Sequence, residues 1–203
     1  MKKMIILATL VVAATFSVAA QNVVISGNFE SGVKWTLYNN GSFVVTGSGG
    51  GMEGFSEKQT GLGFFLKDKS PWYNYSSNIK TVTIGAGITH IGVSNFYNCA
   101  NLTSVTLHDG LKIIFSDAFY GCRSLTSITL PASINRLETS VFDGSGITTL
   151  VVKATTPPAV VANTFLNMPA AAIVYVPNAS VADYKAHAIW GKLNIRRMSD
   201  YKK

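Results

Sequence analysis

The sequence predicts a repeat solenoid, built mainly of β-strands with short helical turns and closed by a cap at each end. Apolar residues recur every 23 positions, and each repeat contains one stretch in which apolar and polar residues alternate. Such a period is typical of solenoids, whose units bury their apolar faces by stacking on neighbours. The pattern stops before either end of the chain, so the terminal segments are expected to cover the ends of the stack.

The first twenty residues have the features of a secretory signal peptide. Met1-Lys2-Lys3 is cationic, residues 4–16 carry no charge, and Ser17-Val18-Ala19-Ala20 supplies small side chains. The sequence predicts cleavage after Ala20. An uncleaved anchor is the alternative, although the apolar run is short for a spanning helix of about 20 residues. No later apolar stretch has that length, so a secreted mature chain without a transmembrane segment is expected.

The positive charge of the chain is concentrated at its C-terminus. The net charge is +7, yet residues 21–184 contain nine basic and nine acidic side chains. Residues 185–203 contain six Lys or Arg and one Asp. Nucleic-acid-binding proteins place their basic residues along a docking surface. The sequence therefore predicts a basic terminal tail and argues against nucleic acid as a partner.

The repeat is clearest in a series of phenylalanines. Phe96, Phe119, Phe142 and Phe165 lie 23 residues apart in succession. Five other apolar columns keep this step: Ile79, Leu102 and Leu125; Val82, Val105 and Ile128; Ile84, Leu107 and Leu130; Ile88, Leu111 and Ile134; and Ile91, Ile114 and Leu137. Each unit thus predicts a strand with one buried face, followed by turns that return apolar residues to the same core. Phe119 is expected to contribute more to stability than Phe43, which lies outside the repeat.

Four regions follow from this pattern: a signal peptide (1–20), a β-rich N-terminal cap (21–78), a solenoid (79–177), and a C-terminal cap with a basic tail (178–203). The glycines between Gly47 and Gly63 predict a mobile loop in the first cap. In the second cap a short helix is expected after Ser180 as N-cap, with Asp183 three residues later. Its apolar residues should cover the last coil; they are Val181, Tyr184, Ala188 and Trp190.

Two units depart from the regular pattern. The third is one residue short and ends in Gly144-Ser145-Gly146. The fourth contains Thr155-Thr156-Pro157-Pro158, where proline cannot donate a ladder hydrogen bond. A looser connection is expected there.

The motif Leu125-Thr126-Ser127-Ile128-Thr129-Leu130-Pro131, followed by Ile134, Leu137 and Phe142, resembles the BspA-like leucine-rich repeat of bacterial surface proteins. The flanking segments resemble the same family; they are Trp35-Thr36-Leu37, Pro71-Trp72-Tyr73-Asn74-Tyr75, Thr156-Pro157-Pro158 and Tyr175-Val176-Pro177. The resemblance implies a leucine-rich-repeat solenoid used in adhesion or interaction at a bacterial surface. It also implies localisation to the periplasm or the bacterial cell surface.

The outward side of the predicted strands is the candidate ligand face. Its positions should stack into two ladders: Thr81, Thr83, Ser104, Thr106, Ser127, Thr129, Thr149, Val151, Ile173 and Tyr175. Threonine is also a favourable strand residue, so a purely structural explanation stands beside the functional one. The sheet face of a solenoid is its usual ligand surface. The near-absence of charged residues on the candidate ligand face favours a protein or glycan partner over an anion.

Two cysteines occupy the same position in neighbouring units. Cys99 and Cys122 could pair in an exported protein. Equivalent side chains in stacked units point the same way, however, and a disulfide needs Cβ atoms about 3.8 Å apart. Two buried thiols are therefore favoured, and the bridge remains the alternative.

The sequence contains no recognisable catalytic set. Residues 49–54 match Gly-x-Gly-x-x-Gly, but no helical pattern follows, so a cap loop is expected rather than a dinucleotide site. His90, His108 and His187 are not expected to converge, and no cofactor or metal is predicted. The leading hypothesis is a non-catalytic secreted binding module that engages a protein or glycan. The alternatives are a structural subunit of a surface assembly and an enzyme of unrecognised type.

Overall fold

A computed structural model describes residues 21–29, 31–47, 50–54 and 70–202, and the backbone of residues 57–60 and 63–66. The predicted signal peptide lies outside these residues. Within them, no helix combines the length and apolarity needed to cross a membrane.

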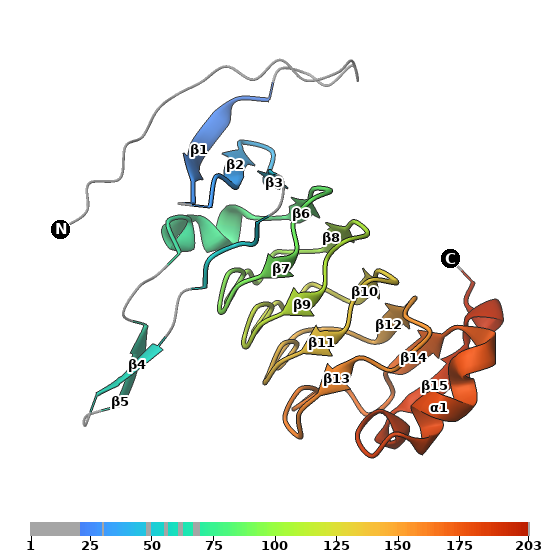
Figure 1. Ribbon diagram of the computed structural model, residues 1–203. Helices are drawn as coiled ribbons and strands as arrows, with labels where there is room; N and C mark the ends of the chain where they lie inside the picture. The colour runs from blue at the N-terminus through green and yellow to red at the C-terminus, as the bar shows by residue number, and fades with distance from the viewer. Residues whose placement is uncertain are drawn as a thin grey trace.

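The chain winds into a stack of coils, each with a long strand, a short strand and a turn that carries the phenylalanine (Figure 1). Coil 1 contains β6 (Thr81–Ile84) and β7 (His90–Ile91), and coil 2 contains β8 (Ser104–Leu107) and β9 (Ile113–Ile114). Coil 3 contains β10 (Ser127–Leu130) and β11 (Arg136–Leu137), and coil 4 contains β12 (Thr149–Val152) and β13 (Ala159–Val160). A last long strand, β14 (Ile173–Val176), begins the C-terminal cap. The predicted solenoid is confirmed.

The coils stack through parallel strands. The short strands form one sheet in the order β13-β11-β9-β7, and the long strands form two ladders. The register follows the 23-residue step, as in the pairing of Val82 with Val105. Phe96, Phe119 and Phe142 are fully buried and their rings stack, with centroids 5.4 and 6.1 Å apart. Phe119 thus packs between Phe96 of the preceding coil and Phe142 of the following one.

Left-handed backbone recurs at two turn positions of the coils, at the first in coils 1 to 3 and at the second in coils 1 to 4. One column contains Ser94, Asp117 and Ser140, with φ of 53–57°. The other contains Asn98, Gly121, Gly144 and Asn167, with φ of 53–68°. Asn, Asp and Gly tolerate this region better than other residues, which explains Asn and Gly in the second column and Asp117 in the first.

The N-terminal cap continues the first long-strand sheet. β1 (Val23–Asn28), β2 (Lys34–Tyr38) and β3 (Ser42–Thr46) form an antiparallel meander, and β3 pairs in parallel with β6. A 3-10 helix, η1 (Tyr73–Asn78), leads into coil 1. The indole Nε1 of Trp72 donates a hydrogen bond of 2.8 Å to the carbonyl of Asn95, which fixes the cap to the first coil.

Phe43 belongs to the core as much as the repeat phenylalanines do. Its side chain is fully buried, and its ring packs against those of Trp35, Trp72 and Phe96, with centroids 4.7–5.9 Å apart. Phe43 and Phe119 are equally buried, so the packing gives no reason to expect a smaller contribution to stability from Phe43. The repeat pattern cannot detect Phe43 because the cap has a sequence of its own.

Part of the glycine-rich segment after β3 packs against coil 1. Residues 50–54 lie beside β7, where the N–H of Met52 donates to the carbonyl of His90 at 3.0 Å. A Cβ on Gly51 would stand about 2 Å from the His90 ring, so a larger residue there would require the ring to move. Farther along, β4 (Glu57–Thr60) and β5 (Gly63–Leu66) form an antiparallel hairpin. Gly49, the first glycine of the Gly-x-Gly-x-x-Gly match, lies outside the described residues.

Coil 3 is one residue short, and coil 4 restores the spacing. Ser127 pairs with Thr149 and Thr149 pairs with Ile173, steps of 22 and 24 residues. At the shortened turn, a Cβ on Gly146 would lie 2.3 Å from the carbonyl oxygen of Arg123. Glycine at position 146 therefore allows the shorter coil to close against its neighbour.

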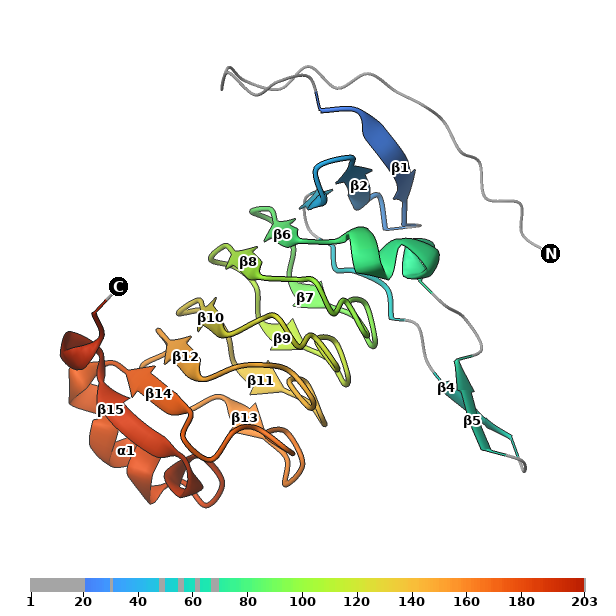
Figure 2. The same cartoon turned by 180° about the vertical axis from the view of Figure 1, so that it is seen from behind.

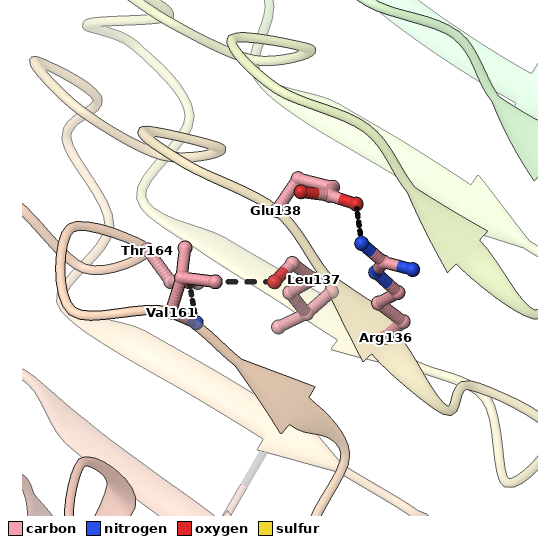
Figure 3. A network of polar contacts seen from close by, with 5 residues as sticks. All are labelled: Arg136, Leu137, Glu138, Val161 and Thr164. Carbon is pink, nitrogen blue, oxygen red and sulfur yellow. Dashed lines mark hydrogen bonds and ion pairs between the residues drawn. The ribbon is translucent and has the colours of Figure 1, made fainter.

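Coil 4 uses a side chain where the central coils use backbone (Figure 3). In coils 2 and 3, Phe115 and Glu138 donate their N–H to carbonyls of the preceding coil, at 3.0 Å each. In coil 4, the N–H of Val161 donates to Thr164 Oγ1 at 2.9 Å, and this hydroxyl donates to the carbonyl of Leu137 at 3.3 Å. On the same surface, Arg136 forms an ion pair of 2.6 Å with Glu138.

The C-terminal cap closes the last coil with two aromatic side chains. Tyr184, on α1 (Val181–Ala186), donates its hydroxyl to the carbonyl of Ala154 at 2.8 Å. Trp190, on η3 (Trp190–Lys192), donates its Nε1 to the carbonyl of Pro158 at 2.8 Å. Both side chains are fully buried. The two acceptors flank the Thr155–Pro158 loop, so the irregular loop of coil 4 anchors the cap.

Two details of the predicted cap are wrong. Ala188 is exposed and does not cover the last coil. Ser180 precedes α1 as expected, but its hydroxyl makes no capping hydrogen bond, because the 3-10 helix η2 (Asn178–Ser180) runs directly into α1.

The predicted basic tail is largely structured. Residues Asn194–Arg197 form β15, which pairs in parallel with β14, and η4 (Met198–Asp200) follows. The end of the chain returns beside the long strands of the last coils (Figures 1 and 2). Part of the C-terminal charge therefore belongs to the sheet itself.

Candidate functional site

The eight candidate ligand residues lie on the outward side of the long strands. We call this side the outer face; it carries Thr81, Thr83, Ser104, Thr106, Ser127, Thr129, Thr149 and Tyr175. Strand register aligns them in two columns within each ladder: Thr81 beside Ser104, and Thr83 beside Thr106. Four of the eight are exposed (Thr81, Ser104, Thr106 and Ser127), and the others are half-buried.

The outer face is not uniform along the stack. Val151, expected as a ladder position, is only 5% exposed. Tyr175 packs against Tyr201, with ring centroids 5.0 Å apart. The C-terminal segment therefore covers the outer face over β12 and β14, and the open part of the face lies over β6, β8 and β10.

The long-strand sheet divides between β8 and β10. β8 is the last strand of the first ladder and β10 is the first of the second, whereas the short strands pair without interruption from β7 to β13. Val105 and Leu107 on β8 are half-buried, although their counterparts Val82 and Ile84 on β6 are fully buried. The division therefore leaves Val105 and Leu107 partly exposed, although both still pack against the core.

A groove of about 440 Å³ lies at this division. Residues from four parts of the chain line it: Val105, Thr106 and Leu107 on β8, Thr129 on β10, Val151 and Lys153 on or after β12, and Met198 and Tyr201 in the C-terminal segment. Its volume lies within the range of about 300–1,000 Å³ typical of small-ligand sites. The groove brings together two of the predicted residues, Thr106 and Thr129, and leaves the other six outside it.

Sequence reasoning missed Lys153, Met198 and Tyr201. Lys153 directly follows β12 in the irregular fourth coil, and nothing in the sequence places it beside the C-terminal segment. Met198 and Tyr201 lie outside the repeat, and their positions depend on β15, whose Asn194-Ile195-Arg196-Arg197 sequence is too polar to predict a strand. The sequence offers one indication of this strand: Ile195 is its single buried residue, and it pairs with the buried Val174.

Lys153 provides the charge in the groove. It directly follows the buried Val152 and is exposed. Arg196 pairs with Tyr175 in the strand register and is also exposed, while its neighbour Ile195 is buried. The outer face, predicted to be nearly uncharged, thus carries basic side chains at its C-terminal end.

Cys99 and Cys122 are buried free thiols. Cys122 Sγ donates to the carbonyl of Phe96 at 3.2 Å. Burial raises the pKa of Cys122 to about 12, and burial together with the neighbouring Cys122 raises the pKa of Cys99 well above its usual value. Neutral, inaccessible thiols are poor nucleophiles and poor metal ligands.

The histidines have separate surroundings. His90 packs its ring edge-on against Phe115 and lines a pocket of about 260 Å³ beside Met52; burial lowers its pKa. His187 accepts backbone hydrogen bonds from Ile189 and Trp190 in the C-terminal cap. Across the described part of the chain, no group of three or more His, Cys, Asp or Glu side chains is placed to hold a metal.

The chain is similar to known repeat proteins in sequence and in fold. The family model for the BspA-type leucine-rich repeat region, with six copies, matches residues 69–184. No curated protein matches the sequence. Among solved structures, a leucine-rich repeat protein from Eubacterium ventriosum is 20% identical with a TM-score of 0.54; the match covers 80% of this chain and 46% of that one. The chain therefore spans less than half the length of that protein.

Two further solved structures belong to proteins described as a cell-surface protein and as a vaccine antigen. The pneumococcal vaccine antigen PcpA is 17% identical, with 82% of this chain and 45% of that chain covered and a TM-score of 0.46. A leucine-rich cell surface protein from Faecalibacterium prausnitzii is 18% identical, with 75% and 54% covered and a TM-score of 0.29. The family match, which covers more than half of the chain, agrees with the 23-residue coils and the parallel ladders: the chain belongs to the BspA-type leucine-rich repeat family.

Proposed function

We propose that the chain is a non-catalytic, secreted binding module that engages a protein or glycan at the bacterial cell surface through the outer face. The observation that carries the proposal is the groove between β8 and β10, because it combines partly exposed apolar residues with the hydroxyls of Thr106 and Thr129. Ligand sites typically pair an apolar surface with a few polar groups that fix orientation. The separate surroundings of the histidines and the buried thiols support a non-catalytic role.

The groove is tested by a pair of substitutions at its centre. Thr106→Lys with Thr129→Lys places bulk and charge into the groove, and desolvation of these charges opposes a bound partner. The wild type, immobilised, is screened against a glycan array and a panel of purified extracellular-matrix proteins. We expect the double variant to lose the ligand that the wild type captures.

A matched control distinguishes damage to the binding site from damage to the fold. Ser124→Lys with Asn163→Lys adds the same charge at exposed positions in turns away from the groove. Both double variants should melt within about 1 kcal/mol of the wild type, since exposed substitutions have small effects. Undiminished capture by the Thr106→Lys, Thr129→Lys variant would place the binding site elsewhere.

A structural role in a surface assembly is the second candidate. β1 is the outer edge strand of the first ladder, and Val23 and Val24 at its start are 56% and 43% exposed. Unprotected edge strands can pair with another chain. Light scattering distinguishes the two roles: an assembly subunit self-associates with rising concentration, and Val24→Lys should prevent this association.

A further inference from the structure

Lys153 gives the groove an unbalanced positive charge. Of the residues that line the groove, it is the charged one. Within the part of the chain that the structure describes, Lys153 forms no ion pair with a carboxylate. Arg196 lies farther along the same outer face, and its Nε donates to Asn194 Oδ1 at 3.0 Å rather than to an acid. The groove is therefore complementary to a ligand with a negative charge.

The rest of the groove suits a sugar. Thr106 and Thr129 present hydroxyls, which both donate and accept hydrogen bonds and so match the hydroxyls of a carbohydrate. Tyr201 and Met198 of the C-terminal segment also line the groove, and an aromatic ring can pack against the apolar face of a sugar while its hydroxyl stays polar. These features extend the expectation of a glycan partner.

The outer face also continues beyond the groove. Thr83 pairs with Thr106, and Thr81 pairs with Ser104, so hydroxyl columns lead from the groove across β8 to β6. Paired strands lie about 4.8 Å apart, so a polymer with a short repeat can meet an equivalent side chain on each strand. A linear ligand therefore fits the face better than a single small molecule does.

We infer that the groove binds a linear polysaccharide that carries carboxylates, such as a polymer of uronic acids. One carboxylate lies at Lys153, a sugar ring packs against Tyr201, and the polymer follows the hydroxyl columns toward β6. This inference rests on the proposed function and specifies its ligand. An acidic peptide is the less favoured ligand, because an extended peptide binds by adding to an unpaired strand edge, and the facing edges of β8 and β10 lie too close together to admit another strand.

The test compares ligands that differ in one property. The full mature chain is titrated with an oligogalacturonide, its fully methyl-esterified form, and polyglutamate of similar length, using calorimetry. We expect the oligogalacturonide to bind about tenfold or more tightly than the ester, since a charge-assisted hydrogen bond is lost in the ester. Binding should weaken as salt is raised from about 50 mM to about 500 mM, because salt screens the charge.

Substitution of the lysine locates the contact. Lys153→Gln should weaken oligogalacturonide binding about tenfold and leave the ester unaffected. Lys112→Gln, an exposed lysine that precedes β9 in the other sheet, is the matched control and should bind as the wild type does. Unchanged urea midpoints in both variants exclude a folding defect.

Several outcomes would overturn the inference. They are equal affinity for acid and ester, equal affinity for polyglutamate, no binding of the oligogalacturonide, or full binding by Lys153→Gln. The proposed function is judged separately, by the Thr106→Lys, Thr129→Lys variant on the wider panel of neutral glycans and proteins. If the oligogalacturonide fails to bind, loss of another captured ligand in that variant would still support the proposed binding function.

Discussion

Asn95 and Thr164 occupy the same repeat position three coils apart and make equivalent hydrogen bonds. Asn95 Oδ1 accepts from the N–H of Gly92 at 3.1 Å, and its Nδ2 donates to the carbonyl of Glu53 at 2.8 Å. Thr164 joins Val161 to Leu137 in the same way. At this position the central coils have Ala118 and Val141, and there the backbone bonds form directly. In both end coils, a side chain thus hydrogen-bonds to the two backbone groups that bond to each other directly in the central coils. We call this arrangement a side-chain relay.

Thr164→Val removes one of these relays without changing the shape of the residue much. The N–H of Val161 and the carbonyl of Leu137 then lose a buried partner, which costs about 1–3 kcal/mol. We expect the urea midpoint to fall accordingly. Thr155→Val, at an exposed position in the same coil, is the control and should leave the midpoint nearly unchanged. Equal midpoints for wild type and Thr164→Val would mean that the two backbone groups pair directly.

Phe119→Ala and Phe43→Ala should destabilise the protein to a similar extent, by about 3–5 kcal/mol each, because both rings are fully buried among other rings. Chemical denaturation followed by circular dichroism measures both. Leu166→Ala, at a side chain that is 44% exposed, should cost much less. A small effect of Phe43→Ala alone would show that the N-terminal cap unfolds separately from the coils.

The buried thiols should resist alkylation in the native protein. Cys99 and Cys122 are inaccessible and stay protonated near pH 8, so iodoacetamide should modify neither. In urea without reductant, both should react, and mass spectrometry counts the added groups. A protein that is unmodified in urea and two daltons lighter than the reduced chain would contain a disulfide instead.

Alkaline pH should destabilise the fold through these thiols. An unfolded thiol ionises near pH 9, whereas burial holds the pKa of Cys122 at about 12 in the folded protein. The unfolded state therefore loses protons first, and stability falls as pH rises from 9 toward 12. The urea midpoint at a pH of about 10.5 should lie below that at about 8. Cys122→Ala should reduce this difference, and Tyr184, whose pKa burial also raises, accounts for part of the remainder.

The coils were predictable because their signal is repeated. The phenylalanine column and the strand alternation of Val105 and Leu107 are visible in the sequence, and they determine the register. The groove was not predictable to the same degree. The division between β8 and β10 follows from no residue in the repeat pattern, and Tyr201 reaches the outer face only because the non-repeating C-terminal segment folds back. Contacts between distant segments without a period leave no local pattern.

The irregular loop of coil 4 has a consequence for engineering this scaffold. It restores the residue missing from coil 3, and its flanking carbonyls, on Ala154 and Pro158, accept hydrogen bonds from Tyr184 and Trp190. Coil 4 and the C-terminal cap therefore form one indivisible module. A designer who lengthens the array should insert extra copies between coils 1 and 2, where the ladders continue and both neighbours have standard length. A junction placed between coil 4 and the cap would leave two aromatic anchors without their acceptors.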